Sequence, residues 1–186
     1  MLKRLTVAVF AAALAMTSAT GTAHAESWQC APFARFFSGV KIFGDAWTWW
    51  EQASGKYTKG FTPNSGAVLV FKPYGAMRRG HVAVVTQVLT DRIVQVTHAN
   101  WSPLAGKRGQ VEQDVTVVDV SANGDWSQVK VWYDPSGDLG RTVYPTYGFI
   151  YGAADAAQDM ARSAVQSAAN AFAGASAAVS EAVSAR

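Results

Sequence analysis

The sequence of 186 residues is poor in cysteine and has no large excess of charge of either sign. Its single cysteine, Cys30, excludes an intramolecular disulfide and every metal site that needs several thiolates. Lysine and arginine total 16 against 13 acidic residues, which gives a formal charge of +3. No run of basic residues is longer than the pairs 78–79 and 107–108, so the broad positive patch of a nucleic-acid-binding protein is missing.

Hydrophobic residues are abundant by contrast, at 49% of the chain, and aromatic residues make up 12%. This composition is too apolar for a wholly disordered protein. The length is that of one ordinary domain rather than two.

Residues 1–25 have the pattern of a secretory signal peptide. Lys3 and Arg4 precede an apolar stretch, and Ala23-His24-Ala25 provides an A-x-A cleavage pattern. The apolar stretch is shorter than the roughly 20 residues that span a bilayer, which argues against an uncleaved anchor. We therefore expect cleavage after Ala25, export to the periplasm or the extracellular space, and no transmembrane span in the mature chain. Cleavage would lower the formal charge to +1 and leave His81 and His98 as the histidines of the mature chain.

The mature chain divides into a domain over residues 26–151 and a tail over residues 152–186. Near the start of the domain, aromatic and apolar residues follow helical spacing, and they form one stripe: Phe33, Phe36, Phe37 and Val40. A second short helix is expected over 46–53 with Asp45 as its N-cap, and with Trp47 and Trp50 packed in the core. Six later segments have strand character: 68–71, 81–88, 92–98, 115–120, 129–133 and 147–151. This order predicts an α+β fold in which amino-terminal helices pack on an antiparallel sheet.

The tail is rich in alanine and serine and contains neither proline nor tryptophan. Val165, Phe172 and Val179 recur every seven residues, which is compatible with a helix. A loosely attached helical or disordered tail and a helix for self-association are both open.

Cys30 falls at the expected start of the first helix. Unpaired N–H groups and the helix dipole at such a position favour a thiolate, which is the nucleophilic form of cysteine. A cysteine nucleophile also needs an imidazole as base and acid, and a third group that orients the imidazole.

The two histidines of the mature chain flank an expected β-hairpin. A two-residue loop at 90–91 would place Ala83 opposite His98, and His81 opposite Asn100. His81, His98 and Asn100 would then share one face, since residues two apart on a strand point the same way. Buried histidines that serve only packing remain an alternative, and a one-residue change in the loop would separate the faces.

Five blocks of the sequence resemble the CHAP family, whose name stands for cysteine, histidine-dependent amidohydrolase/peptidase. In chain order they are Trp28-Gln29-Cys30 with Phe33-Ala34-Arg35, Gly44-Asp45-Ala46-Trp47, residues 63–71, Gly80-His81-Val82-Ala83, and Thr97-His98-Ala99-Asn100-Trp101. The resemblance covers roughly residues 28–150. It implies a papain-like fold, with Cys30 as nucleophile and His81 as general base.

The resemblance also implies a third catalytic position. Many CHAP enzymes have Glu there and Asn two residues later, whereas this chain has His98 and Asn100; related cell-wall cysteine peptidases use a second histidine. His98 is therefore expected to orient His81, with Asn100 as the alternative. A second departure is Ala67, where many members have Asp. Trp101 is expected to contact substrate, with core packing as the competing explanation.

The function that the resemblance implies is hydrolysis of peptidoglycan amide bonds, in the stem peptide or at the lactyl amide, through an acyl-enzyme. No cofactor or metal is required. One alternative is a catalytically silent CHAP-type domain that binds or assembles on the cell envelope. Another is a metal site made of Cys30, His81 and His98, although these ligands lack the short spacing typical of such sites.

Overall fold

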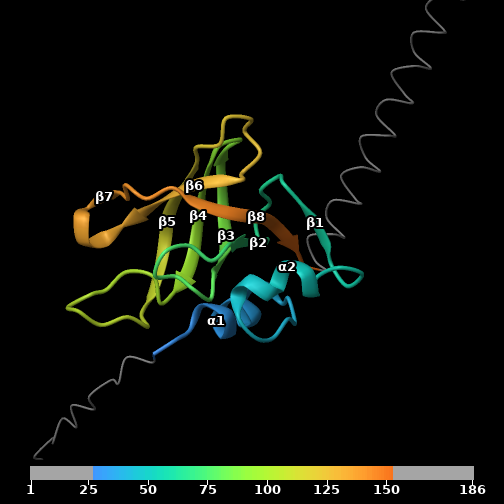
Figure 1. Ribbon diagram of the computed structural model, residues 1–186, viewed down its shortest axis with the longest axis horizontal. Helices are drawn as coiled ribbons and strands as arrows, with labels where there is room; N and C mark the ends of the chain where they lie inside the picture. Colours follow the sequence, from blue (N-terminus) through green and yellow to red (C-terminus); the bar gives the residue numbers. More distant parts are fainter. Residues whose placement is uncertain (1–26, 153–186) are drawn as a thin grey trace, which may run out of the picture.

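The computed structural model describes residues 27–152 (Figure 1). The predicted signal peptide, and the predicted tail apart from Gly152, lie outside the described residues. No helix within residues 27–152 is long and apolar enough to cross a membrane.

Three short helical segments precede the sheet: α1 (Cys30–Ser38), the 3-10 helix η1 (Ala46–Thr48) and α2 (Trp49–Gln52). Gly39 ends α1 in the left-handed conformation, at φ 72°, which a residue without Cβ adopts without strain. Asp45 precedes η1 as predicted, but its side chain makes no capping hydrogen bond.

The predicted aromatic stripe of the first helix is only partly correct. Phe33 is fully buried, whereas Phe36 is 71% exposed and Phe37 is 58% exposed. The second helix differs in the same way, because Trp49 is the fully buried tryptophan and Trp47 is 45% exposed. The helices are so short that few residues of each are buried, and helical spacing alone does not show which ones.

The sheet within residues 27–152 has eight strands: β1 (Thr58–Gly60), β2 (Val68–Phe71), β3 (His81–Thr90), β4 (Ile93–Ala99), β5 (Val111–Asp119), β6 (Gln128–Tyr133), β7 (Asp138–Leu139) and β8 (Tyr144–Tyr151). A fourth helical segment, η2 (Asp134–Ser136), joins β6 to β7. The six predicted strands are confirmed as β2–β6 and β8, while β1 and β7 are too short to leave a pattern in the sequence.

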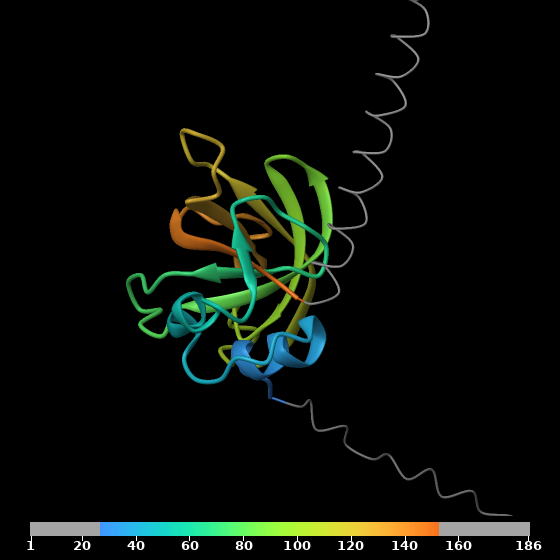
Figure 2. The ribbon, with the colours of Figure 1, turned by 90° about the vertical axis from the view of Figure 1, so that its right-hand side faces the viewer.

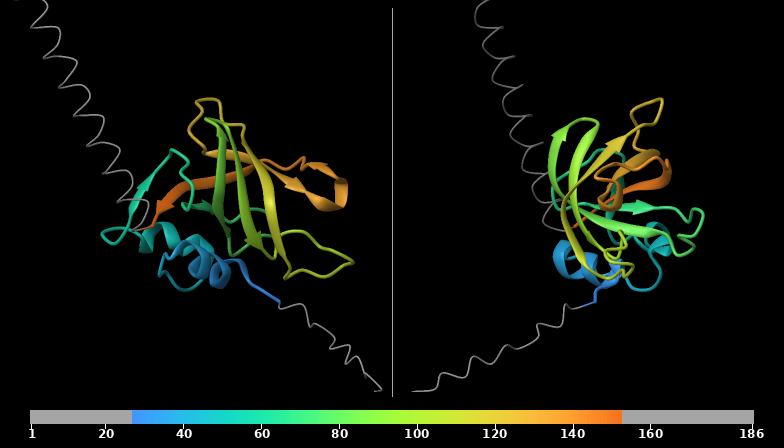
Figure 3. Two further views of the ribbon diagram at one scale, coloured as in Figure 1. Left: turned by 180° about the vertical axis from the view of Figure 1, so that it is seen from behind. Right: turned by 90° about the vertical axis from the view of Figure 1, so that its left-hand side faces the viewer.

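The predicted antiparallel sheet closes on itself, which the sequence did not indicate. The strand order is β1-β8-β2-β3-β4-β5-β6-β7, and β8 also pairs with β6. Strands β2–β6 and β8 therefore form a six-stranded antiparallel barrel, and β1 and β7 extend it at its sides. Figures 2 and 3 show the barrel with the helices gathered near the start of β3 and the end of β4.

Two hydrophobic clusters stabilise this arrangement, one inside the barrel and one beneath the helices. Alternate residues of β2 serve the two clusters: Leu69 and Phe71 point into the barrel, and Val68 and Val70 pack against the helices. The outer cluster includes Ala34 of α1 and Trp49 of α2, so burial of these apolar side chains holds the helical segments on the barrel wall.

The β3–β4 hairpin reaches the predicted register by another route. The turn lies at residues 91–92, because Thr90 pairs with Ile93. Two irregularities between Val85 and Thr90 then shift the register, so that Val84 pairs with Thr97. This register continues to place Ala83 opposite His98, as predicted, although the loop is one residue later than expected.

Candidate active site

Cys30 is the first residue of α1, and the chain approaches it in an extended conformation. Gln29 has φ −94° and ψ 150°, and Trp28 donates its backbone N–H to Gly109 O at 2.7 Å. The thiol is half-buried beside the cluster between helices and barrel, and it forms no disulfide. The backbone N–H groups of Ala31, of Val82 and of Cys30 itself act on the sulfur. The start of α1 thus presents the thiol to the beginning of β3.

His81 and His98 meet inside the end of the barrel. His81 begins β3, His98 lies in β4, and His81 Nε2 is 3.0 Å from His98 Nδ1. Both side chains are buried. The Trp101 ring stacks on the His98 ring, and Phe71 packs edge-on against the His81 ring. Packing on these aromatic rings restricts both imidazoles, so the histidine pair has a defined orientation.

Gly80 allows His81 to start its strand at this point. Its φ is +65°, and a Cβ there would lie 2.7 Å from Phe71 O and 3.0 Å from Trp47 N. Trp47 N also donates to Arg79 O, so η1 lies close to the start of β3. A larger residue before His81 would therefore displace either the strand or the segment that follows α1.

The side chain of Asn100 contacts the residue before Cys30. Its side-chain amide donates to Gln29 Oε1 at 2.8 Å, and its backbone is in the left-handed region at φ 66°. His98 contacts the His81 ring, whereas Asn100 links the end of β4 to the residue before Cys30. The structure thus brings together Cys30, His81, His98 and Asn100, and it gives the two alternatives for the third position different contacts.

The contact between the two rings constrains their protons. If His81 Nδ1 is to accept a proton, its other nitrogen, Nε2, must carry the N–H and donate to His98 Nδ1. His98 then carries its own proton on Nε2, a buried atom without a hydrogen-bond partner among the described residues. This tautomer makes His98 an acceptor that fixes the His81 ring.

Burial sets the charge state of all three groups. It raises the pKa of the Cys30 thiol, against the opposing effect of the backbone N–H groups of Val82 and Ala31. Burial, the neighbouring His98 and the Arg108 guanidinium lower the pKa of His81 well below its usual value, and burial lowers the pKa of His98 to about 3. At the start of α1, loss of hydration thus opposes the N–H groups that favour the expected thiolate.

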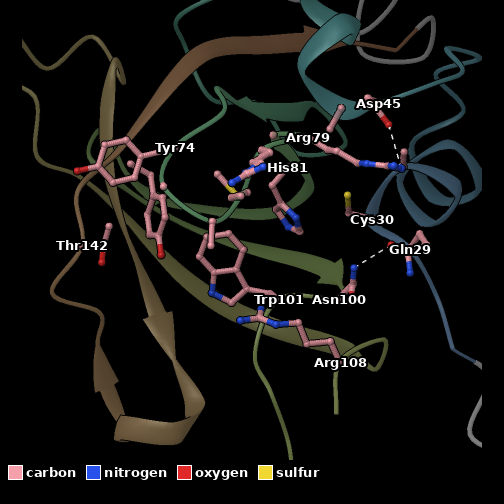
Figure 4. Close-up of a pocket in the computed structure, with 18 of the residues that line it drawn as sticks. Gln29, Cys30, Asp45, Tyr74, Arg79, His81, Asn100, Trp101, Arg108 and Thr142 are labelled. Atoms are coloured by element: carbon pink, nitrogen blue, oxygen red, sulfur yellow. Dashed lines mark hydrogen bonds and ion pairs between the residues drawn. The ribbon is translucent and has the colours of Figure 1, made fainter. Parts of the chain in front are cut away.

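A pocket of about 800 Å³ opens over this site and has the size of a ligand-binding cleft. Cys30 and His81 both line it, and Figure 4 shows the His81 ring between Cys30 and Trp101 in that view. The other lining residues include Gln29, Ala31 and Pro32 around the start of α1, residues 44–46 and residues 74–80. Six come from later in the chain: Asn100, Trp101, Arg108, Tyr133, Thr142 and Tyr144. His98 lies behind His81 and does not line the pocket.

The position of Trp101 is compatible with both of the explanations that were left open. It is buried among Phe71, His81 and Tyr144, and it also lines the pocket. Several lining residues were not singled out as site residues from the sequence, among them Tyr133, Tyr144 and Arg108. They lie in loops or at strand ends, where only the folded chain reveals a shared wall. Residues 27–152 contain no group of three or more His, Cys, Asp or Glu side chains arranged to hold a metal ion.

Substitutions at the third position should separate His98 from Asn100. His98→Ala is expected to lower kcat by about 10²-fold, because the His81 ring loses the acceptor that selects its tautomer. Asn100→Ala should lower kcat less than tenfold. It removes a hydrogen bond to the Gln29 side chain, but the backbone of Gln29 and the position of Cys30 on α1 should not change. Steady-state kinetics of both variants tests this, and a larger loss for Asn100→Ala would contradict it.

The histidine pair should also make the fold sensitive to mild acid. A buried histidine with a pKa depressed on folding contributes its full stability above the unfolded pKa of about 6.5, and loses it as the pH falls towards the folded value. For His98, with a folded pKa of about 3, the window lies between these two values. Within this window, each such histidine should lower the free energy of unfolding by up to about 1.4 kcal/mol for every unit by which the pH falls. Urea denaturation at pH 7 and pH 5 measures the loss, and equal midpoints would be incompatible with two buried neutral imidazoles.

Comparison with known protein families agrees with this arrangement. Residues 20–100 match the family model described as the CHAP domain. The matched range contains Cys30, His81, His98 and Asn100. A comparison with curated proteins gave no match.

Proposed function

The chain belongs to the CHAP domain family through residues 20–100, and on this basis we propose that it is an exported cysteine hydrolase that cleaves amide bonds of peptidoglycan. Members of this family are generally cysteine hydrolases, and the family implies a peptidoglycan substrate. The bond would lie in the stem peptide or at the lactyl amide. The observation that carries the proposal is the contact between His81 and His98 behind a pocket that Cys30 and His81 line together.

Catalysis would begin with both reacting groups neutral. The pKa of Cys30 is raised and that of His81 is lowered, so the unliganded pair is a thiol and a neutral imidazole. His81 Nδ1 would remove the thiol proton as the sulfur attacks the substrate carbonyl. His98 would hold the His81 ring through the Nε2–Nδ1 contact, and His98 Nδ1 would accept the Nε2 hydrogen bond while His81 carries the positive charge.

The remaining steps follow from the same groups. The tetrahedral intermediate would place its oxyanion near the backbone N–H of Cys30 at the start of α1. Its collapse breaks the C–N bond, and the leaving amine takes the proton held by His81. Water, deprotonated by His81, then attacks the thioester, which releases the acid product and the Cys30 thiol. No step needs a cofactor or a metal. The start of α1, with Cys30, lies against β3, with His81, and this placement supports the papain-like fold that the resemblance implies.

We also propose that Trp101 contacts the substrate. Its ring lies against His81 and lines the pocket, so it would pack on apolar parts of a bound peptide.

The mature enzyme would start at Glu26 and act in the periplasm or outside the cell.

One observation favours a second function, a catalytically silent CHAP-type domain that binds or assembles on the envelope. Burial raises the pKa of the Cys30 thiol, and a buried thiol of this kind is often inert. The silent domain would bind peptidoglycan without releasing products.

Digestion of purified peptidoglycan by the exported protein separates the two functions. The hydrolase should release fragments with one new amino group for each bond cleaved, and mass spectrometry should assign the bond. Cys30→Ala protein provides the matched control. Identical product profiles from the two proteins would exclude the hydrolase, and cosedimentation with peptidoglycan would then support the silent domain.

A further inference from the structure

Positive charge gathers on the rim of the pocket that contains Cys30 and His81. Three arginines line it, Arg78, Arg79 and Arg108, against one carboxylate, that of Asp45. Arg79 is already engaged, because its guanidinium lies 3.5 Å from Asp45 (Figure 4). Arg78 and Arg108 form no ion pair with any residue in the described part of the chain, so two cationic groups face the pocket uncompensated.

Arg108 is the arginine whose charge reaches the catalytic centre. Its guanidinium acts on His81 and contributes to the lowered pKa of that ring. Figure 4 shows its side chain running beneath Trp101, with Asn100 between Arg108 and Cys30 in that view. A ligand group bound by Arg108 would thus lie close to the atoms that react.

The loop that carries Arg108 is tied to the segment that carries Cys30. Gly109, the next residue, accepts the backbone N–H of Trp28 at 2.7 Å, and Trp28 is two residues before Cys30. A Cβ at Gly109 would collide with Ser27, so the two segments are packed without space between them. Arg108 therefore has a backbone position fixed relative to the nucleophile.

The base of the same loop is also closed by hydrogen bonds. Glu112 Oε1 accepts the backbone N–H of Ser102 at 2.7 Å, and the Gln110 side chain donates to Ser102 O. Asn100 N donates to Gln110 O at 3.0 Å. A guanidinium on such a fixed loop loses less entropy when it binds a ligand, because its backbone is already ordered.

We propose that Arg108 binds a free carboxylate of the peptide substrate beside the scissile amide, so that the enzyme selects anionic peptides over neutral ones. The inference rests on the proposed function and deepens it. A guanidinium matches the planar geometry of a carboxylate with two parallel N–H donors, and this pairing is among the stronger charge-assisted hydrogen bonds. Arg78 on the facing loop adds positive charge, and Arg79 forms an ion pair with Asp45, the carboxylate among the residues that line the pocket.

A matched pair of substrates tests the proposal. The first is a peptidoglycan stem peptide with its free carboxylates intact, and the second is the same peptide with those carboxylates converted to carboxamides. The exported protein is expected to show a kcat/KM about tenfold or more higher for the carboxylate form. Arg108→Gln should reduce the ratio of the two kcat/KM values at least fivefold. Arg108→Lys should retain part of this ratio, because lysine keeps the positive charge but lacks the two parallel N–H donors of the guanidinium.

Lys107→Gln is the control variant. It removes the same charge from the adjacent residue of the same loop, but Lys107 does not line the pocket, so the ratio should not change. Equal kcat/KM for the two substrates with the unmodified protein would overturn the inference while leaving the hydrolase intact. A ratio unaltered by Arg108→Gln would overturn it as well.

Failure of the proposed function gives a different result. If neither peptide is cleaved, the hydrolase is excluded, and binding of the two peptides to Cys30→Ala protein decides on the carboxylate site. Calorimetry should show binding about tenfold tighter for the carboxylate peptide, and equal affinities would overturn the inference.

Discussion

Replacement of Cys30 by alanine is expected to reduce amide hydrolysis by at least about 10⁴-fold. The sulfur is the atom that would form the thioester, and the described residues provide no second thiol. Removal of a nucleophile costs this much because binding and the oxyanion donors alone give only weak catalysis. The variant should keep the fold, since the half-buried thiol makes few contacts that a methyl group cannot replace.

Cys30→Ser is the matched control for shape. A hydroxyl fits the site, but its proton is far harder to remove than that of a thiol, so hydrolysis should fall almost as far as with alanine. Peptide products followed by mass spectrometry give the rates, and urea denaturation checks the fold. A Cys30→Ala protein that retains a tenth of the activity would show that another group attacks the carbonyl.

Replacement of His81 by glutamine should reduce kcat by about 10³-fold. Glutamine can occupy the polar end of the barrel and donate its amide N–H to His98 Nδ1, but it cannot take up and return a proton. The thiol of Cys30, whose pKa burial already raises, then has no base beside it.

Alkylation of Cys30 by iodoacetamide provides an independent readout for the same variant. The alkylation rate should fall in His81→Gln at neutral pH and recover at alkaline pH, where hydroxide removes the thiol proton. Urea denaturation should show a stable fold for the variant at pH 7. Unchanged alkylation and unchanged kcat in a folded variant would remove His81 from the mechanism.

The strands of this fold could be predicted from the sequence because barrel strands alternate between two buried environments. The segment from Val68 to Phe71 is apolar throughout, since one side faces the barrel core and the other faces the helices. Closure of the barrel depends on the contact between β8 and β6, whose partners Gln128 and Pro145 carry no distinctive pattern. Neither residue type nor spacing indicates such a long-range pairing.

The histidine pair was predictable for a simple geometric reason. Side chains on adjacent antiparallel strands share a face when the register is right, and His81 and His98 meet this condition. The loop position was wrong by one residue, and the two irregularities between Val85 and Thr90 compensated for it. A hairpin register derived from loop length alone is thus correct here only through cancellation.

The charge state of Cys30 could not be predicted in the same way. The helix start is visible in the sequence, and it favours a thiolate, but the depth of burial follows from how α1 packs on β3 and β4. In the fold that burial is large enough to raise the pKa of the thiol. Arg108 is a parallel case, since its place on the pocket rim depends on the hydrogen bond between Trp28 and Gly109.

Trapping of the acyl-enzyme tests the central claim most directly. The exported protein is mixed with peptidoglycan stem peptide, quenched in acid during turnover, digested and analysed by mass spectrometry. The account predicts that the peptide containing Cys30 carries the acyl half of the substrate as a thioester, and that His81→Gln protein does not accumulate it. Product release without any adduct on Cys30, together with full activity of Cys30→Ala, would contradict it.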